Sequence, residues 1–122
     1  MSGSILQSSC VAEKIRTACE TVVSDVFPQI YTGALLHYVT YNYNIIPSVW
    51  TESGPAASRY LCQVHFYLPH KEDPREDILG LQRALFDAGF TWPDVTDAED
   101  AEGQHWVLEC EYADGGGVYG YA

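Results

Sequence analysis

The sequence predicts an α+β fold, in which an antiparallel sheet is built on a long β-hairpin and two helices pack on one of its faces. Residues 36–68 form the hairpin, because two runs of aromatic and β-branched residues flank the turn-like segment 52–55. Segments with helical periodicity precede and follow it, and residues 104–112 alternate as a closing strand. The 122 residues suit a single domain, with residues 113–122 as a Gly/Tyr-rich C-terminal tail.

Residues 4–25 have the pattern of an amphipathic helix. Apolar residues recur at the helical spacing on one face, at Val11, Ile15, Ala18 and Val22. Pro28 ends the pattern, because proline cannot continue a helix interior. We expect a short edge strand soon afterwards, at Ile30-Tyr31.

Alternate side chains of the hairpin fall on opposite faces. One face is apolar and should be buried within the subunit, at Cys62, Val64 and Phe66. The other face of the same arm is mixed in polarity and holds Leu61, Gln63, His65 and Tyr67. Pro47 interrupts the pairing, so the first arm should bend or bulge there. The mixed face indicates a surface that meets another molecule, and Trp50 near the tip should be buried only in a complex.

Residues 73–88 carry the clearest helix signals in the chain. Asp73 is expected to be the N-cap, with Pro74 at the first helical position and Glu76 completing a capping box. Gly89 is typical of the left-handed residue that follows a helix.

The net charge is −11, from 17 acidic and 6 basic residues. No stripe of lysine and arginine is present to neutralise phosphates, which argues against direct binding of nucleic acid. The apolar runs are too short for a membrane span, and the N-terminus lacks the features of a signal peptide. We therefore expect a cytosolic protein, with residues 94–103 as an exposed acidic loop.

Four cysteines, Cys10, Cys19, Cys62 and Cys110, match no zinc-binding spacing. A metal site built from Cys62, Cys110, His65 and His105 is disfavoured, because residues three or five apart on a strand point to opposite faces. A cysteine nucleophile needs an exposed and activated thiol, whereas Cys62 and Cys110 fall on core faces. We predict no catalytic residue, no metal and no cofactor.

Four short segments, taken in order, resemble a known family. They are YVTY at 38–41, QVHFY at 63–67, DAGF at 87–90 and WVLECEY at 106–112. The arrangement resembles that of the tail-terminator (tail-completion) proteins of long-tailed bacteriophages. These motifs mark a fold and carry no chemistry, and the Gly-rich C-terminus departs from the family pattern.

The resemblance implies a structural virion protein without enzymatic activity. Such a protein forms a homo-oligomeric ring, expected to be a hexamer, on the head-proximal end of the tail tube. Its partners would be the tail tube protein and a head–tail connector or stopper protein, while DNA would only pass through the lumen. It would be assembled in the host cytoplasm and reside in the neck of the virion.

Two sets of residues follow from this interpretation. Contacts with other chains are expected at the hairpin tip and in the tail, from Trp50, Thr51, Glu52, Ser53, Gly54, Pro55, Val118, Tyr119 and Tyr121. An acidic lumen would repel the DNA backbone and let it slide. The carboxylates expected to face it are Asp94, Asp97, Glu99, Asp100, Glu102, Glu109 and Glu111.

Three alternatives stay open at this point. The nearest is another neck component, such as a head-completion or stopper protein. A small enzyme that uses a Cys/His pair would show elevated thiol reactivity at Cys62 or Cys110. A small-ligand binding domain would use the aromatic hairpin face as a pocket wall and would stay monomeric.

Overall fold

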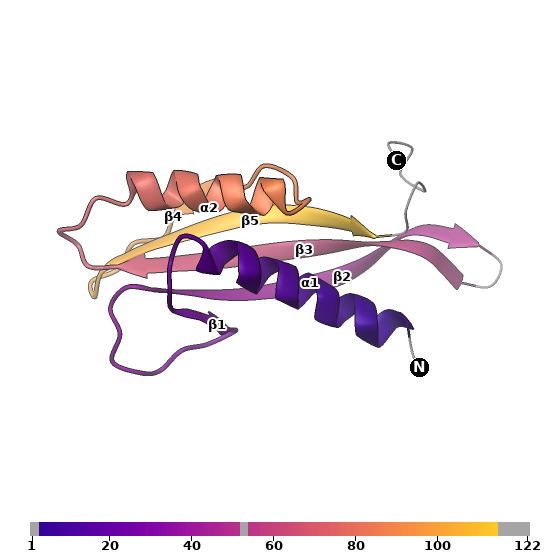
Figure 1. Cartoon of the computed structure of the whole chain (residues 1–122), viewed down its shortest axis with the longest axis horizontal. Coiled ribbons are helices and arrows are strands. Elements are labelled where there is room, and N and C mark those ends of the chain that lie inside the picture. Colours follow the sequence, from indigo (N-terminus) through magenta and orange to yellow (C-terminus); the bar gives the residue numbers. More distant parts are fainter. Residues whose placement is uncertain (1–2, 52–53, 115–122) are drawn as a thin grey trace.

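The computed structural model describes the backbone of residues 3–51 and 54–114, and the side chains of residues 11–46 and 59–113. A five-stranded sheet with strand order β1-β2-β3-β5-β4 carries two helices on one face (Figure 1). The elements are α1 (Gly3–Glu20), β1 (Val26–Pro28), β2 (Tyr38–Thr51), β3 (Gly54–Leu68), α2 (Arg75–Asp87), β4 (Asp94–Asp97) and β5 (Gln104–Asp114). The α+β prediction is confirmed. Over the described residues, neither helix is long and apolar enough to cross a membrane.

The hairpin of β2 and β3 is the longest paired unit in the sheet. Its register runs from Tyr38 opposite Tyr67 to Thr51 opposite Gly54. Register shifts fall on both sides of Val49, directly after Pro47. A proline lacks the N–H that the ladder requires, so the predicted irregularity at Pro47 is confirmed.

The sheet is mixed rather than purely antiparallel, because β1 pairs with β2 in the parallel direction. The short edge strand lies at Val26–Pro28 and not at Ile30-Tyr31, so its predicted position was wrong. Val26 is buried, and the carbonyl of Asp25 accepts a hydrogen bond from the Val39 N–H at 2.9 Å. Burial of Val26 against the helices decides which residues pair, whereas Ile30 stays exposed.

Helix α1 ends at Glu20, five residues before the predicted end. The hydroxyl of Thr21 donates a hydrogen bond to the Ala18 carbonyl at 2.7 Å, which satisfies a carbonyl at the helix end. The β-branched residues Thr21, Val22 and Val23 follow, and such residues favour helix less than straight chains do. The apolar spacing therefore continued past the point where the backbone leaves the helix.

Helix α2 begins differently from the capping-box prediction. Its N-cap is Pro74, and no side chain caps it. Asp73 instead accepts hydrogen bonds from the backbone N–H and the guanidinium of Arg75, and these bonds lower the pKa of Asp73 to about 2. At the other end Gly89 has φ of 105°, as predicted for the residue after a helix.

The acidic segment 94–103 is not simply a loop, as the sequence suggested. Its first four residues form β4, an edge strand antiparallel to β5, with Val95 opposite Leu108. Val95 packs against the core and is the apolar residue that anchors this otherwise polar strand to the sheet. Only the turn that follows, closed by a bridge between Asp100 and Gly103, matches the predicted exposed loop.

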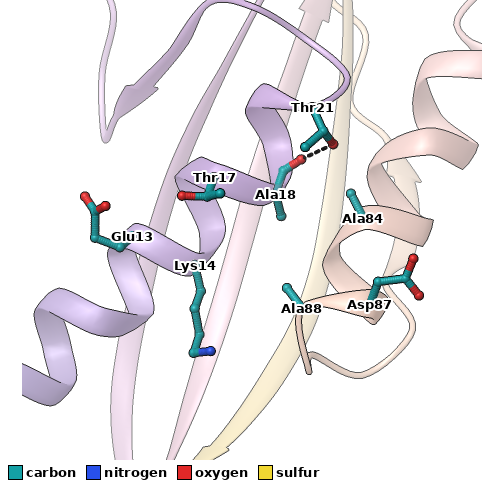
Figure 2. A pocket seen from close by; sticks show the side chains of 8 residues that line it. All are labelled: Glu13, Lys14, Thr17, Ala18, Thr21, Ala84, Asp87 and Ala88. Atoms are coloured by element: carbon teal, nitrogen blue, oxygen red, sulfur yellow. Dashed lines mark hydrogen bonds between the residues drawn. The ribbon is translucent and has the colours of Figure 1, made fainter.

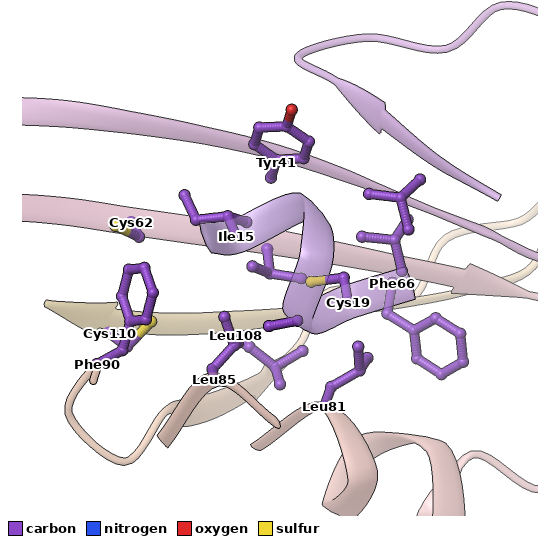
Figure 3. Close-up of a cluster of buried hydrophobic side chains, with 14 of the residues drawn as sticks. Ile15, Cys19, Tyr41, Cys62, Phe66, Leu81, Leu85, Phe90, Leu108 and Cys110 are labelled. Atoms are coloured by element: carbon purple, nitrogen blue, oxygen red, sulfur yellow. The ribbon is translucent and has the colours of Figure 1, made fainter. Parts of the chain in front are cut away.

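The hydrophobic core lies between the helices and the sheet (Figure 3). Leu81 and Leu85 of α2 and Ile15 of α1 are fully buried against the strands. The strands contribute buried side chains that include Cys62, Val64, Phe66, Leu108 and Cys110. The prediction that Cys62, Val64 and Phe66 are buried within the subunit is confirmed.

Candidate assembly surface

The face of the sheet turned away from α1 and α2 has no helix on it within the described chain (Figure 1). In β3 its residues alternate with the core residues, and all four are half-buried: Leu61, Gln63, His65 and Tyr67. We call this the outer face. Because strand side chains alternate, the same backbone that builds the core places these groups on the other side of the sheet, where they form a candidate contact surface.

A row of rings crosses the outer face near the ends of the strands opposite the hairpin tip. Phe27 stacks on Tyr31 with ring centroids 4.3 Å apart, and Tyr31 lies 4.8 Å from Tyr38. Tyr38 stacks on Tyr67 at 4.6 Å, and Tyr67 stacks on His105 at 4.4 Å. We call these five rings the aromatic row. Aromatic side chains carry much of the binding energy at protein interfaces, so the row is a candidate contact surface.

His65 and His105 meet at one end of the aromatic row. The Nδ1 of His65 lies 2.8 Å from the Nε2 of His105, and the ring centroids are 5.1 Å apart. Burial lowers the pKa of both histidines, and the charge of His105 lowers that of His65 further. Only one proton fits between two facing nitrogens, so the pair is stable as a neutral donor and acceptor.

Three of the predicted lumen-facing carboxylates come together on the outer face. Asp94 of β4 is the register partner of Glu109 of β5, and Glu111 follows two residues later. The side chain of Gln63 donates to Glu109 at 3.0 Å, and Arg59 pairs with Glu111 at 3.3 Å. Like charges in register repel each other, so the strand pairing and the partners Gln63 and Arg59 hold this acidic surface in place.

The other four predicted carboxylates lie at the end of β4 and in the turn between β4 and β5. They are Asp97, Glu99, Asp100 and Glu102. Asp97 accepts the N–H of Glu99, and Asp100 accepts the N–H of Glu102. Glu99 also pairs with His70 at 2.8 Å, which raises the pKa of that histidine. The structure therefore divides the predicted acidic set into an outer-face group and a turn group.

The predicted interface residues fall largely outside the described side chains. Backbone pairing reaches Trp50 opposite Pro55 and Thr51 opposite Gly54, but the side chains of residues 47–58 are not described. Glu52 and Ser53, and Val118, Tyr119 and Tyr121 in the C-terminal tail, lie outside the described residues. The contacts expected of them stay predictions.

The three cysteines whose side chains the structure describes lack the features of a nucleophile. Cys19, Cys62 and Cys110 are buried and unbridged. Burial raises the pKa of the Cys19 thiol to about 12, and the neighbouring Cys110 together with burial raises that of Cys62. No group of three or more histidine, cysteine or acidic residues suited to a metal occurs among the described residues. A reactive thiolate needs the opposite environment.

The helical side of the molecule carries a groove and an apolar patch. The groove, about 590 Å³, runs between the helices over Ala18, Ala84 and Ala88, with the Lys14 side chain along it (Figure 2).

A separate group of large side chains on and after α2 is exposed: Leu79, Phe86 and Trp92. We call this group the α2 patch. This patch is on the helical side, so the molecule has two different surfaces that carry exposed apolar or half-buried aromatic groups.

No protein-family model, curated protein or solved structure matches this chain. The site must therefore be interpreted from its own geometry.

Sequence reasoning missed two features of this surface. The contact between His65 and His105 joins residues forty positions apart, and the aromatic row includes Phe27 and Tyr31 from a segment with no regular pattern. Alternation within each strand indicated that His65, Tyr67 and His105 lie off the core face. The strand register that brings them together was not visible in any one segment.

Proposed function

We propose that this protein is a structural, ring-forming subunit of the tail-terminator type from a long-tailed bacteriophage. In this role it caps the tail tube and joins it to the head connector, with DNA passing through the lumen. The observation that carries the proposal is the hairpin of β2 and β3. Its pairing continues to Thr51 opposite Gly54, whereas β5 accompanies β3 as far as Ser58 opposite Asp114 in the described chain.

The end of the hairpin projects past both helices and β5 (Figure 1). A two-stranded ribbon is marginally stable alone in water, because it has too little apolar surface to bury on itself. This ribbon is also rich in apolar residues, among them Val49 and Trp50. A neighbouring subunit that covers it would supply the missing burial.

The two exposed surfaces support a closed ring over a twofold dimer. In a ring, one patch of a subunit meets a different patch of the next subunit. The α2 patch lies on the helical side, while the aromatic row lies on the opposite side of the sheet. The net charge of −11 fits a lumen that repels DNA passing through it.

The test is the mass of the purified full-length chain by light scattering, combined with electron microscopy, alone and after addition to purified tail tubes. We expect a concentration-dependent ring, or rings at one end of each tube. A head-completion or stopper protein would instead leave the tube end bare and bind the head connector. A chain that stays monomeric at high concentration and binds neither the tail tube nor the head connector contradicts the proposal.

A shortened hairpin provides the decisive variant. Replacing residues 48–57 with Asn-Gly joins Pro47 to Ser58, which are register partners, through a two-residue turn. We expect this variant to fold with an unchanged thermal transition, because the described core lies outside the excised segment, and to lose ring formation. Glu20→Ala at the end of α1 is the control and should assemble normally.

A further inference from the structure

A cavity of about 580 Å³ opens at the end of the sheet opposite the hairpin tip. Three loops gather there: residues 29–37, 69–74 and 98–103 (Figure 1). Its lining includes Tyr31, Leu36, Tyr38, Tyr67, Asp100 and Glu102, and we call it the base pocket. The tail-terminator proposal assigns three rings of this pocket to the aromatic row, but it gives the pocket itself no ligand.

One wall of the base pocket is aromatic. Tyr31, Tyr38 and Tyr67 belong to the aromatic row, in which the Tyr31 ring is tilted against Tyr38 and Tyr38 stacks on Tyr67. The hydroxyl of Tyr31 accepts a hydrogen bond from the Leu35 N–H at 3.1 Å, which holds the loop against this wall. A stacked wall of this kind is preformed, so a ligand does not have to pay for ordering it.

Another part of the base pocket lining is acidic. Asp100 and Glu102 line it from the turn before β5. Burial raises the pKa of the Tyr38 hydroxyl, and the charges of Glu102 and Asp100 raise it further, as expected of carboxylates close to the ring. Within the described chain, no lysine, arginine or histidine forms an ion pair with either carboxylate. Glu99 next to them is already paired with His70.

The rim of the base pocket is apolar and exposed. Leu35 and Leu36 both line the pocket, and they are 40% and 70% exposed. Single exposed leucines are ordinary on protein surfaces, but two adjacent exposed leucines that line one cavity are a candidate contact surface. Lys71 and His70 also line the pocket, so the two carboxylates leave it with a net negative charge when His70 is neutral.

From these features we infer that the base pocket binds an arginine from an extended segment of another protein, with apolar residues beside it. The aliphatic stem of the arginine packs on Tyr38 and Tyr67, and its guanidinium pairs with Asp100 and Glu102. An arginine fits this arrangement better than a lysine, because its planar fork stacks on rings and bonds carboxylates at two points. The flanking apolar side chains cover Leu35 and Leu36.

The test uses the full-length chain labelled with ¹⁵N and the blocked peptide acetyl-Gly-Leu-Arg-Leu-Gly-amide. We expect the peptide to shift backbone amide resonances of residues 31–38, 67–71 and 100–104. The same peptide with citrulline in place of arginine keeps the shape but loses the charge. Its dissociation constant should be at least about tenfold higher, as for the loss of a charge-assisted hydrogen bond.

Two double variants separate the pocket from the general acidity of the protein. D100N/E102Q should raise the dissociation constant of the arginine peptide by about tenfold or more. D94N/E109Q removes the same charge from the outer face and should change the affinity by less than about twofold, because exposed charges at a distance are screened by salt. Thermal unfolding of both variants checks that they fold.

Several results would overturn the inference. These are resonance shifts outside the base pocket, equal binding of the citrulline peptide, equal loss in both double variants, or no shift at millimolar peptide. Self-association of the chain that D100N/E102Q abolishes would also overturn it, because the occupant would then be a second copy. Ring formation should be unaffected by D100N/E102Q, so failure here is distinct from failure of the tail-terminator proposal.

Discussion

The two faces of β3 differ sharply although they share one backbone. Cys62, Val64 and Phe66 face the helices and are at most 1% exposed. His65 and Tyr67, one position away, are half-buried and contact other rings of the outer face. The comparison teaches that a strand with a period of two can build a core on one side and a half-buried aromatic surface on the other. A substitution on the core face of β3 should therefore mainly affect folding, whereas one on the outer face should mainly affect association.

The largest expected effect is a difference in stability between variants of Phe66 and Tyr67, which are neighbours in β3 but lie on opposite faces of the sheet. Phe66→Ala removes a fully buried ring and should lower the free energy of unfolding by about 3–5 kcal/mol, because the cavity cannot fully collapse. Tyr67→Ala removes a half-buried ring and should cost roughly 1 kcal/mol. Urea denaturation of both variants measures the difference. Equal losses would mean that the outer face belongs to the folding core.

The three buried thiols should be inert in the native protein. In a C10S variant, Cys19, Cys62 and Cys110 should react with a disulfide reagent only as fast as the protein unfolds. For Cys19, a pKa of about 12 leaves a thiolate fraction near pH 8 that is smaller than that of an ordinary thiol by about a thousandfold. All three should react at once in guanidinium. Rapid modification of native Cys62 or Cys110 would favour the Cys/His enzyme instead.

The histidine pair of the outer face should make stability depend on pH. The folded-state pKa values of His65 and His105 are lowered, so the unfolded chain binds more protons below its own pKa of about 6.5. The free energy of unfolding should be at its full value above about pH 6.5 and fall as the pH drops through the lowered values. H65Q/H105Q should flatten this slope in urea titrations at several pH values.

His70 provides an internal contrast for this pH dependence. Its pKa is raised by Glu99, so its contribution is present below about pH 6.5 and is lost as the pH rises through the raised value. H70Q should therefore steepen the increase in stability between acidic and neutral pH. The same slope in H70Q and H65Q/H105Q would show that other groups control it.

The smallest effect is expected on the acidic part of the outer face. Glu109→Gln removes a carboxylate directly opposite Asp94, so it should raise the free energy of unfolding by a few tenths of a kcal/mol, up to about 1 kcal/mol. Thermal unfolding at low and high salt measures this, and the gain should shrink in 1 M NaCl because salt screens the repulsion. A loss of stability would mean that the Gln63 to Glu109 hydrogen bond outweighs the repulsion.

Local pattern was sufficient for much of the fold. Alternation predicted the two arms of the hairpin and its buried residues Cys62, Val64 and Phe66, and Pro47 predicted the irregular pairing. Gly89 predicted the end of α2. These features are set by the chirality and steric demands of single residues and by the strand and helix periods, all of which are local.

Tertiary structure decided the rest. Val26 rather than Ile30 forms the edge strand, and Val95 turns an acidic segment into β4, because each gains burial against a core made by distant residues. The contact between His65 and His105 and the base pocket depend on strand register and on three loops meeting at one end of the sheet. Such contacts join residues far apart in the chain, so no local pattern encodes them.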